Sequence, residues 1–141
     1  MEQTGPRGEL LVAEKLIEHG WSVAPPLGSN YPFDLIVNKG DKFLRLQVKA
    51  TLVQRNYKHS RPHYQFQLAH GVSSKKRYTA DQVDFFVCCA LDSRRFWVLP
   101  FEAATVVTLK IYNGEGGKFH RYEDAWGLLN LWPISDPKPD P

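Results

Sequence analysis

Apolar and polar positions along the chain follow two different spacings, which predict one long helix followed by a series of strands. Residues 5–19 carry apolar side chains at helical spacing, and Gly20 follows as a typical helix terminator. Later segments alternate with a period of two or are rich in β-branched and aromatic residues, which favours strands. The expected strands are 21–24, 33–37, 42–50, 64–68, 84–91, 96–99 and 106–111, with short helices at 79–82, 101–104 and 122–131.

Turn-forming residues at 38–41 separate the strands at 33–37 and 42–50, so these two strands are expected to form an antiparallel hairpin. A length of 141 residues suits one domain, which we place at residues 1–135. The order of a helix, then strands, then mixed elements predicts a fold of the α/β (α+β) class. Residues 136–141 are rich in Pro and Asp and are expected to form a disordered tail.

The sequence predicts neither a signal peptide nor a membrane span. The N-terminus is polar, and no apolar run approaches the roughly 18 residues that a span requires. Cys88 and Cys89 are adjacent within an apolar run, an arrangement that favours buried thiols over a disulfide. Both features lead us to expect a cytoplasmic protein.

The net charge of +3 conceals a strongly basic middle section of the chain. Ten of the 18 Lys and Arg residues lie between Lys39 and Arg77, where Asp41 is the only acidic residue. Such a block is typical of a surface that binds nucleic acid, although a solvated basic face without a partner has the same composition. We expect a DNA-contacting segment at residues 52–78, because Arg and Asn can read base edges and Lys binds phosphates. The predicted DNA contacts are Ser29, Asn30, Arg55, Lys58, Arg61, Lys75, Lys76 and Arg77.

Four polar residues in otherwise apolar segments are the candidates for chemistry. Glu9 falls on the apolar arc of the predicted helix, where an ionised carboxylate is costly unless it is paired or binds a metal. Asp34 lies early in an apolar strand, although Asp disfavours strands. Gln47 and Lys49 lie side by side on one face of their strand. An even register in the hairpin places Asp34 on that same face, opposite Arg45 and diagonal to Gln47.

Each candidate also has an ordinary structural explanation. Glu9 can lie in a hydrated first helical turn, where the helix dipole favours a carboxylate. Asp34 can serve as a turn or capping residue, and the face that carries Gln47 and Lys49 can be the solvent side of the sheet. These explanations are independent of one another, whereas a shared site accounts for all four residues together.

The ordered motifs resemble those of the PD-(D/E)XK nuclease superfamily. These are Glu9 in the first helix, the segment 32–37 with Asp34, and the segment 47–51 with a Gln-Val-Lys triplet. The chain is most similar to the small group I intron homing endonucleases of this fold, which carry Gln where most members have Asp or Glu. The resemblance covers about residues 5–104 and implies a restriction-endonuclease-like core, a helix and a mixed central sheet in the order αβββαβ with flanking helices.

The resemblance also implies a catalytic site made of Glu9, Asp34, Gln47 and Lys49. Glu9, Asp34, the side-chain oxygen of Gln47 and the carbonyl of Val48 would hold Mg²⁺, for which Mn²⁺ can substitute. Lys49 would orient the attacking water or offset charge on the transition state. Because Gln47 is neutral, metal affinity is expected to be weakened and Glu9 to matter more than in relatives with three carboxylates.

The implied function is divalent-metal-dependent hydrolysis of double-stranded DNA by an endonuclease of the homing type. Cutting both strands requires two active sites, so a homodimer or homotetramer is expected. Two alternatives remain open from the sequence. A structure-selective nuclease similar to the Holliday junction resolvases would prefer branched DNA, and a degenerate DNA-binding module would bind DNA in EDTA without cutting it.

Overall fold

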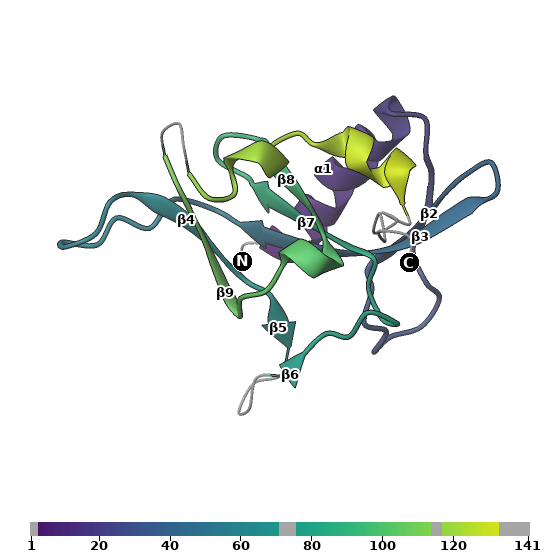
Figure 1. Ribbon diagram of the computed structural model, residues 1–141, viewed down its shortest axis with the longest axis horizontal. Helices are drawn as coiled ribbons and strands as arrows, with labels where there is room; N and C mark the ends of the chain where they lie inside the picture. The colour runs from purple at the N-terminus through teal and green to yellow at the C-terminus, as the bar shows by residue number, and fades with distance from the viewer. Residues whose placement is uncertain (1–2, 71–75, 114–116, 133–141) are drawn as a thin grey trace, which may run out of the picture.

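The computed structural model describes residues 3–70, 76–113 and 117–132. Its centre is a five-stranded sheet with the strand order β1-β2-β3-β7-β8 (Figure 1). β3 and β7 run parallel and the other neighbours antiparallel, so the sheet is mixed and the predicted fold class is confirmed. The helix α1 covers Thr4–Glu18, and the strands are β1 (Ser22–Ala24), β2 (Leu35–Lys39), β3 (Lys42–Thr51), β7 (Phe85–Ala90) and β8 (Arg95–Pro100).

Both faces of the central sheet are covered. α1 and the 3-10 helix η3 (Trp126–Leu131) pack on one face around Val12 and Leu16. A second, two-stranded sheet of β4 (His63–Gln67) and β9 (Thr108–Tyr112) covers the other face. Burial on both faces explains why β7 is an unbroken apolar run with every residue buried.

The connection from β3 to β7 differs from the expected αβββαβ order. In the described part of this connection, strands and a turn stand where the second helix was expected. β4 is followed by the short hairpin of β5 (Ala69–His70) and β6 (Lys76–Arg77), and then by a turn at 79–82. The sheet of β4 and β9 therefore covers the face that a crossover helix would otherwise protect. The segment between β3 and β4 projects from one end of the molecule as an arm (Figure 1).

The predicted helix at 122–131 is wrong as a single element. The chain instead forms two short 3-10 helices, η2 (His120–Tyr122) and η3, with a third, η1, at Phe101–Ala103. Glu123 interrupts the helical path because it is extended and forms a β-bridge with Trp97. Asp124 follows with a φ of 53°, a conformation that a right-handed helix does not accommodate.

The hairpin of β2 and β3 has a register that differs from the expectation by two residues. Gly40 and Asp41 form a two-residue loop, which the positive φ of Gly40 permits. Ile36 is therefore the partner of Arg45, and Asp34, which precedes β2, bonds to Leu46 and Val48 on either side of Gln47. The predicted placement of Asp34 opposite Arg45 is wrong, and the observed register brings Asp34 nearer to Gln47.

Two expectations about exposure have different outcomes. Cys88 and Cys89 are buried free thiols, as predicted, and burial raises the pKa of Cys89 to about 11. The apolar spacing of residues 5–19 also includes Leu10 and Ile17, which are not buried but 72% and 63% exposed. No helix in the described part of the chain is long and apolar enough to cross a membrane.

Candidate active site

Glu9 reaches the sheet because α1 approaches β3 very closely one residue earlier. Gly8 is buried against Ala50, and a Cβ atom at Gly8 would lie 2.6 Å from the Ala50 Cβ. Val12 and Leu16, one and two turns further along, continue this contact into the core. Glu9 therefore lies beside the buried face of α1, half-buried, at the end of the sheet where β2 begins.

Substituting Gly8→Ala tests this contact. An alanine normally stabilises a helix interior by about 1 kcal/mol relative to glycine. Here the added methyl group meets Ala50, and overpacking costs typically 1–3 kcal/mol. We expect a net loss of stability on chemical denaturation together with impaired activity, since Glu9 moves with the helix. Gly5→Ala is the matched control, because a Cβ at Gly5 meets nothing within 4 Å and should leave stability equal or higher. Equal stability gains in both variants would contradict the close approach.

Asp34 is held by the backbone of β3. Its Oδ2 accepts a hydrogen bond from the Val48 N–H at 2.8 Å, and its own N–H donates to the Leu46 carbonyl at 2.8 Å. The side chain thus occupies the position of a strand carbonyl just before β2 starts, which explains how Asp is accommodated there. In a strand the N–H and C=O of one residue point to the same side. The Val48 carbonyl is consequently directed toward the side of β3 where Asp34 lies.

Gln47 lies between Leu46 and Val48, the two residues that bond to Asp34, and is buried, with 7% of its surface exposed. Its Nε2 donates to the Pro32 carbonyl at 2.6 Å. Since a carbonyl can only accept, this bond fixes the amide orientation and leaves Oε1 as the end available to a ligand. The burial of Gln47 excludes the ordinary explanation that its side chain lies on the solvent face of the sheet.

Lys49 lies on the same face as Gln47, one pleat further along β3. Its Nζ is 3.3 Å from the Tyr78 hydroxyl and 5.3 Å from the centre of the Tyr78 ring. Burial raises the pKa of Asp34, and the positive charge of Lys49 acts against that rise, so the ammonium lies within electrostatic reach of the carboxylate. Tyr78 is itself buried, so its hydroxyl is a fixed partner for a flexible lysine.

Glu9 and Asp34 open into one cavity of about 240 Å³, whose wall is the loop 25–31. Ser29 and Asn30, two predicted DNA contacts, line the same cavity. The described residues contain no cluster of three or more His, Cys, Asp or Glu side chains suited to a metal. The available donors are two carboxylates, an amide oxygen and a backbone carbonyl, which are hard oxygen donors of the kind that Mg²⁺ and Mn²⁺ prefer.

The ionised forms of both carboxylates are unfavourable in the folded protein. Burial is the main cause that raises the pKa of Glu9 above its ordinary 4.5, and the negative charge of Asp34 adds to it. Burial also raises the pKa of Asp34 above 3.8, although the Val48 hydrogen bond and Lys49 act in the opposite direction. A bound divalent cation would stabilise both carboxylates in their ionised form, so this pair of residues suits a metal site.

A pH dependence follows from these shifts. An acid whose pKa is raised by folding binds its proton more tightly in the folded state, so stability falls as pH rises through the raised pKa. Asp34→Asn should therefore raise the thermal midpoint of the metal-free protein at pH 7, and this gain should vanish below pH 3.8, where Asp34 is protonated. The exposed Asp41→Asn is the control and should change little. A lower midpoint for Asp34→Asn at pH 7 would show that burial does not dominate at Asp34.

Comparison with known proteins agrees with this geometry. A sequence profile for the PD-(D/E)XK endonucleases matches residues 1–129. The chain belongs to the PD-(D/E)XK endonuclease family. The solved structure of a bacterial homing endonuclease, I-Ssp6803I, is similar with a TM-score of 0.76 at 17% identity, covering 96% of each chain. At that identity the likeness shows the fold, whereas the family match supports an endonuclease. A search of curated proteins gave no match.

Five of the DNA contacts predicted for this PD-(D/E)XK endonuclease lie at the Glu9–Asp34 cavity or on the arm. Ser29 and Asn30 line the Glu9–Asp34 cavity. Arg55 and Lys58 are exposed on the arm, whose base is closed by backbone hydrogen bonds between Arg55 and His63. Arg61 also lies on the arm but contacts Tyr112 at a second cavity, at the far edge of the central sheet.

The remaining predicted contacts lie on β6 or outside the described residues. Lys76 and Arg77 are exposed on β6. The Arg77 guanidinium donates to the carbonyls of Ala104 and Thr105, so it also ties β6 to the segment after η1. Lys75 lies outside the described residues.

Tyr78 and the segment 83–86 with Asp84 belong to the family resemblance, but neither residue was predicted to have a role in the site. Tyr78, the partner of Lys49, is one aromatic residue at the end of the basic segment. Asp84 is buried and forms a forked ion pair with Arg45, which fixes β7 against β3 two residues before Gln47. An alternation pattern identifies neither residue as a part of the site, because both act through partners more than 25 positions away.

Proposed function

We propose that this PD-(D/E)XK endonuclease hydrolyses double-stranded DNA with the help of Mg²⁺ or Mn²⁺, as an enzyme of the homing type. The observation that carries the proposal is the convergence of Glu9, Asp34, Gln47 and Lys49 at one end of β2 and β3. Ser29 and Asn30 line the same cavity as Glu9 and Asp34, and the basic arm follows β3 directly in the chain. The homing endonuclease fold of I-Ssp6803I supports the more specific assignment.

The residues that would hold the cation are Glu9, Asp34, Gln47 and Val48. When bound, the cation would acidify a water molecule and offset charge on the phosphate. The protein prepares this donor set before any ligand arrives. Val48 N–H holds one oxygen of Asp34 and leaves the other available, and the bond from Gln47 Nε2 to the Pro32 carbonyl leaves Oε1 as the acceptor end of that amide.

Lys49 would act on the reacting phosphate rather than on the cation. Its ammonium is held by the Tyr78 hydroxyl on the face of β3 that carries Gln47. From that position it would donate to the phosphate oxygen that gains charge in the transition state, or orient the attacking water. The tyrosine restricts the lysine to a narrow set of positions, which lowers the entropy lost when it meets the phosphate.

Double-strand cleavage also implies a partner subunit. One site cuts one strand, so we propose that two or four copies of the chain act together. The Mg²⁺ requirement, the duplex substrate and the oligomer are separable parts of the proposal, and each has its own measurement.

The substrate preference is tested with a mixture of linear, branched and random-sequence duplexes incubated with Mg²⁺, with Mn²⁺ or with EDTA. We expect cleavage of particular linear sequences, dependent on the cation. Sequence-independent preference for branched DNA would indicate a junction nuclease instead. Binding without cleavage in every metal would indicate a degenerate binding protein. Sedimentation of the DNA complex would give the number of subunits.

Substituting Gln47→Glu should have opposite effects on the stability of the metal-free protein and on its affinity for Mn²⁺. The carboxylate cannot donate to the Pro32 carbonyl, and loss of this buried hydrogen bond should lower the metal-free stability by about 1–3 kcal/mol. The added negative charge should at the same time raise the affinity for Mn²⁺, measured by calorimetry. A complete loss of Mn²⁺ binding would show that Gln47 does not contact the cation. Gln67→Glu, at an exposed position on β4, is the control and should change neither quantity appreciably.

A further inference from the structure

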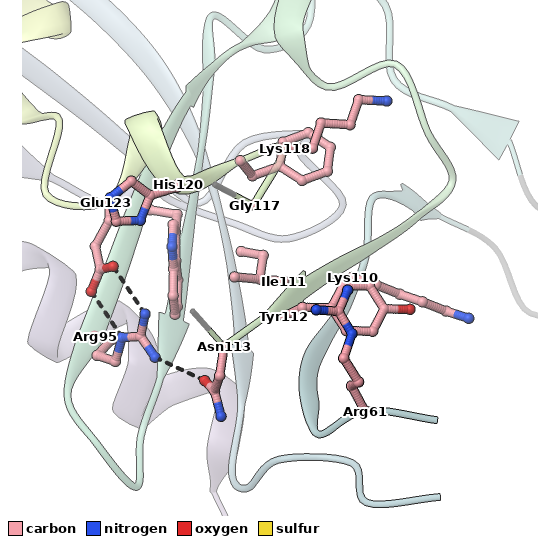
Figure 2. Close-up of a pocket in the computed structure, with 12 residues that line it drawn as sticks. Arg61, Arg95, Lys110, Ile111, Tyr112, Asn113, Gly117, Lys118, His120 and Glu123 are labelled. Atoms are coloured by element: carbon pink, nitrogen blue, oxygen red, sulfur yellow. Dashed lines mark hydrogen bonds and ion pairs between the residues drawn. The ribbon is translucent and has the colours of Figure 1, made fainter. Parts of the chain in front are cut away.

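A second cavity, of about 330 Å³, lies at the β8 edge of the central sheet, between β8, β9 and η2 (Figure 2). It shares no lining residue with the cavity of Glu9 and Asp34. Its wall includes four strong bases, Arg61, Arg95, Lys110 and Lys118. The proposed catalytic chemistry uses none of them.

The charge around this cavity is unbalanced. Arg95 forms a forked ion pair with Glu123, with distances of 2.8 and 2.9 Å, and is thereby fixed in place. In the described part of the chain, Arg61, Lys110 and Lys118 have no carboxylate partner within 4.0 Å. Glu115 lies outside the described residues and does not enter this comparison. The described walls therefore carry three uncompensated positive charges.

Aromatic rings hold the bases in position and form much of the apolar wall. The Arg61 guanidinium lies 4.7 Å from the centre of the Tyr112 ring, and the Arg95 guanidinium lies 4.9 Å from that of Trp97. Figure 2 shows Arg61 and Arg95 on opposite sides of the cavity, with the amino groups of Lys110 and Lys118 extending outward. Arg61 has no carboxylate partner among the described residues, so its guanidinium can bind two oxygens of one phosphate, and the lysines can attract an anion from solution.

One wall residue also has an unused donor. Trp97 is fully buried, and its Nε1–H finds no acceptor among the described residues. A buried N–H without an acceptor is costly, and such groups are normally bonded. The Nε1 atom is itself inaccessible to solvent, so the indole lies behind the cavity wall, where it can report on a bound ligand without contacting it.

We propose that this cavity binds a phosphate group carried by a nucleotide. Arg61, Lys110 and Lys118 recognise its charge, and Arg95 is held in the wall by Glu123 and Asn113. The nucleotide is either free in solution or part of a DNA strand that extends beyond the catalytic site. The proposal rests on the cavity itself and does not require the protein to be a nuclease.

The test follows the indole N–H signal of Trp97 by NMR, assigned with Trp97→Phe. Inorganic phosphate, a deoxynucleoside monophosphate and a short duplex in EDTA are titrated separately. We expect the Trp97 signal to shift and to saturate with at least one of these ligands. Trp21 provides an internal control, because its Nε1–H is also buried and unpartnered but lies outside the cavity, so its signal should stay in place. No movement of the Trp97 signal with any of the three would overturn the proposal.

Two double variants separate the cavity from general charge. Arg61→Ala with Lys110→Ala removes two bases that line it, whereas Arg55→Ala with Lys58→Ala removes two exposed bases of the arm that do not. We expect the first pair to weaken the ligand by about tenfold or more, as for lost charge-assisted hydrogen bonds, and the second pair to leave the mononucleotide affinity unchanged. Equal weakening by both pairs would contradict a built site.

The three ligands identify the source of the phosphate. Saturation by the duplex at concentrations where the mononucleotide has no effect would assign the cavity to DNA. The reverse order would assign it to a free nucleotide. Because no step of this test measures cleavage, a failure here leaves the proposed nuclease function standing, and a lack of cleavage leaves the phosphate site standing.

Discussion

Lys49→Ala is expected to slow single-turnover DNA cleavage by about 10²–10³-fold, the usual effect of removing one group that stabilises charge in a transition state. DNA affinity should change little, since Lys49 is one base among the many of the basic segment. Two structural features explain why the cleavage rate should fall while DNA affinity changes little. Lys49 is half-buried beside Asp34, and its ammonium is already held by Tyr78 rather than extended into solvent.

Lys42→Ala is the matched control for this variant. Lys42 begins the same strand, at the end away from the site, and donates to the carbonyl of Asn130. Removing it takes away the same charge and should leave the cleavage rate within about twofold of wild type, the level expected of a surface change. Equal rates for Lys49→Ala and the wild-type protein would remove Lys49 from the site, whatever the effect on binding.

Asp84→Ala is expected to have the largest effect on stability, a loss of about 3 kcal/mol in the free energy of unfolding. The Asp84 carboxylate is buried, and its Oδ2 accepts from the backbone N–H of Arg45 at 2.7 Å. The same oxygen accepts from Arg45 Nε, and Oδ1 accepts from Nη2. Truncation leaves a buried N–H and a half-buried guanidinium without these acceptors. It also loosens β7 from β3 next to Gln47, so metal-dependent activity should fall with stability.

Glu18→Ala is the control for the loss of an ion pair. Glu18 contacts Lys15 on the exposed side of α1 at 3.6 Å, and such pairs contribute less than about 1 kcal/mol. Chemical denaturation of both variants gives the comparison. If Asp84→Ala were no less stable than Glu18→Ala, the fork between Asp84 and Arg45 would not be what fixes β7 against β3.

Local patterns were sufficient for the central part of the fold. The period of two along β3 placed Gln47 and Lys49 on one face, and the turn formers at 38–41 predicted the hairpin. Both follow from chemistry within a few residues of the position in question. The motif order predicted the mixed sheet and the family, because the spacing of Glu9, Asp34 and Gln47 reflects how the first elements of this fold meet.

Contacts between distant segments decided what the sequence could not predict. The register at Asp34 depends on a two-residue turn at Gly40 and Asp41. The four turn-forming residues at 38–41 allow this turn but do not require it. The broken helix at 122–131 depends on the bridge from Glu123 to Trp97. The position of Glu9 depends on Gly8 meeting Ala50, a steric fit that no periodicity reports.

The most direct test of the site is cleavage of a linear duplex as a function of Mg²⁺ concentration, for the wild-type protein and for Asp34→Asn. Asparagine keeps the acceptor for Val48 N–H and removes the charge that would hold the cation, so the fold and DNA affinity in EDTA should be retained. We predict cleavage by the wild type only when the cation is present, and none by Asp34→Asn at any concentration. Cleavage by the wild type in EDTA, or an unchanged rate for Asp34→Asn, would contradict a metal-dependent site at Glu9, Asp34, Gln47 and Lys49.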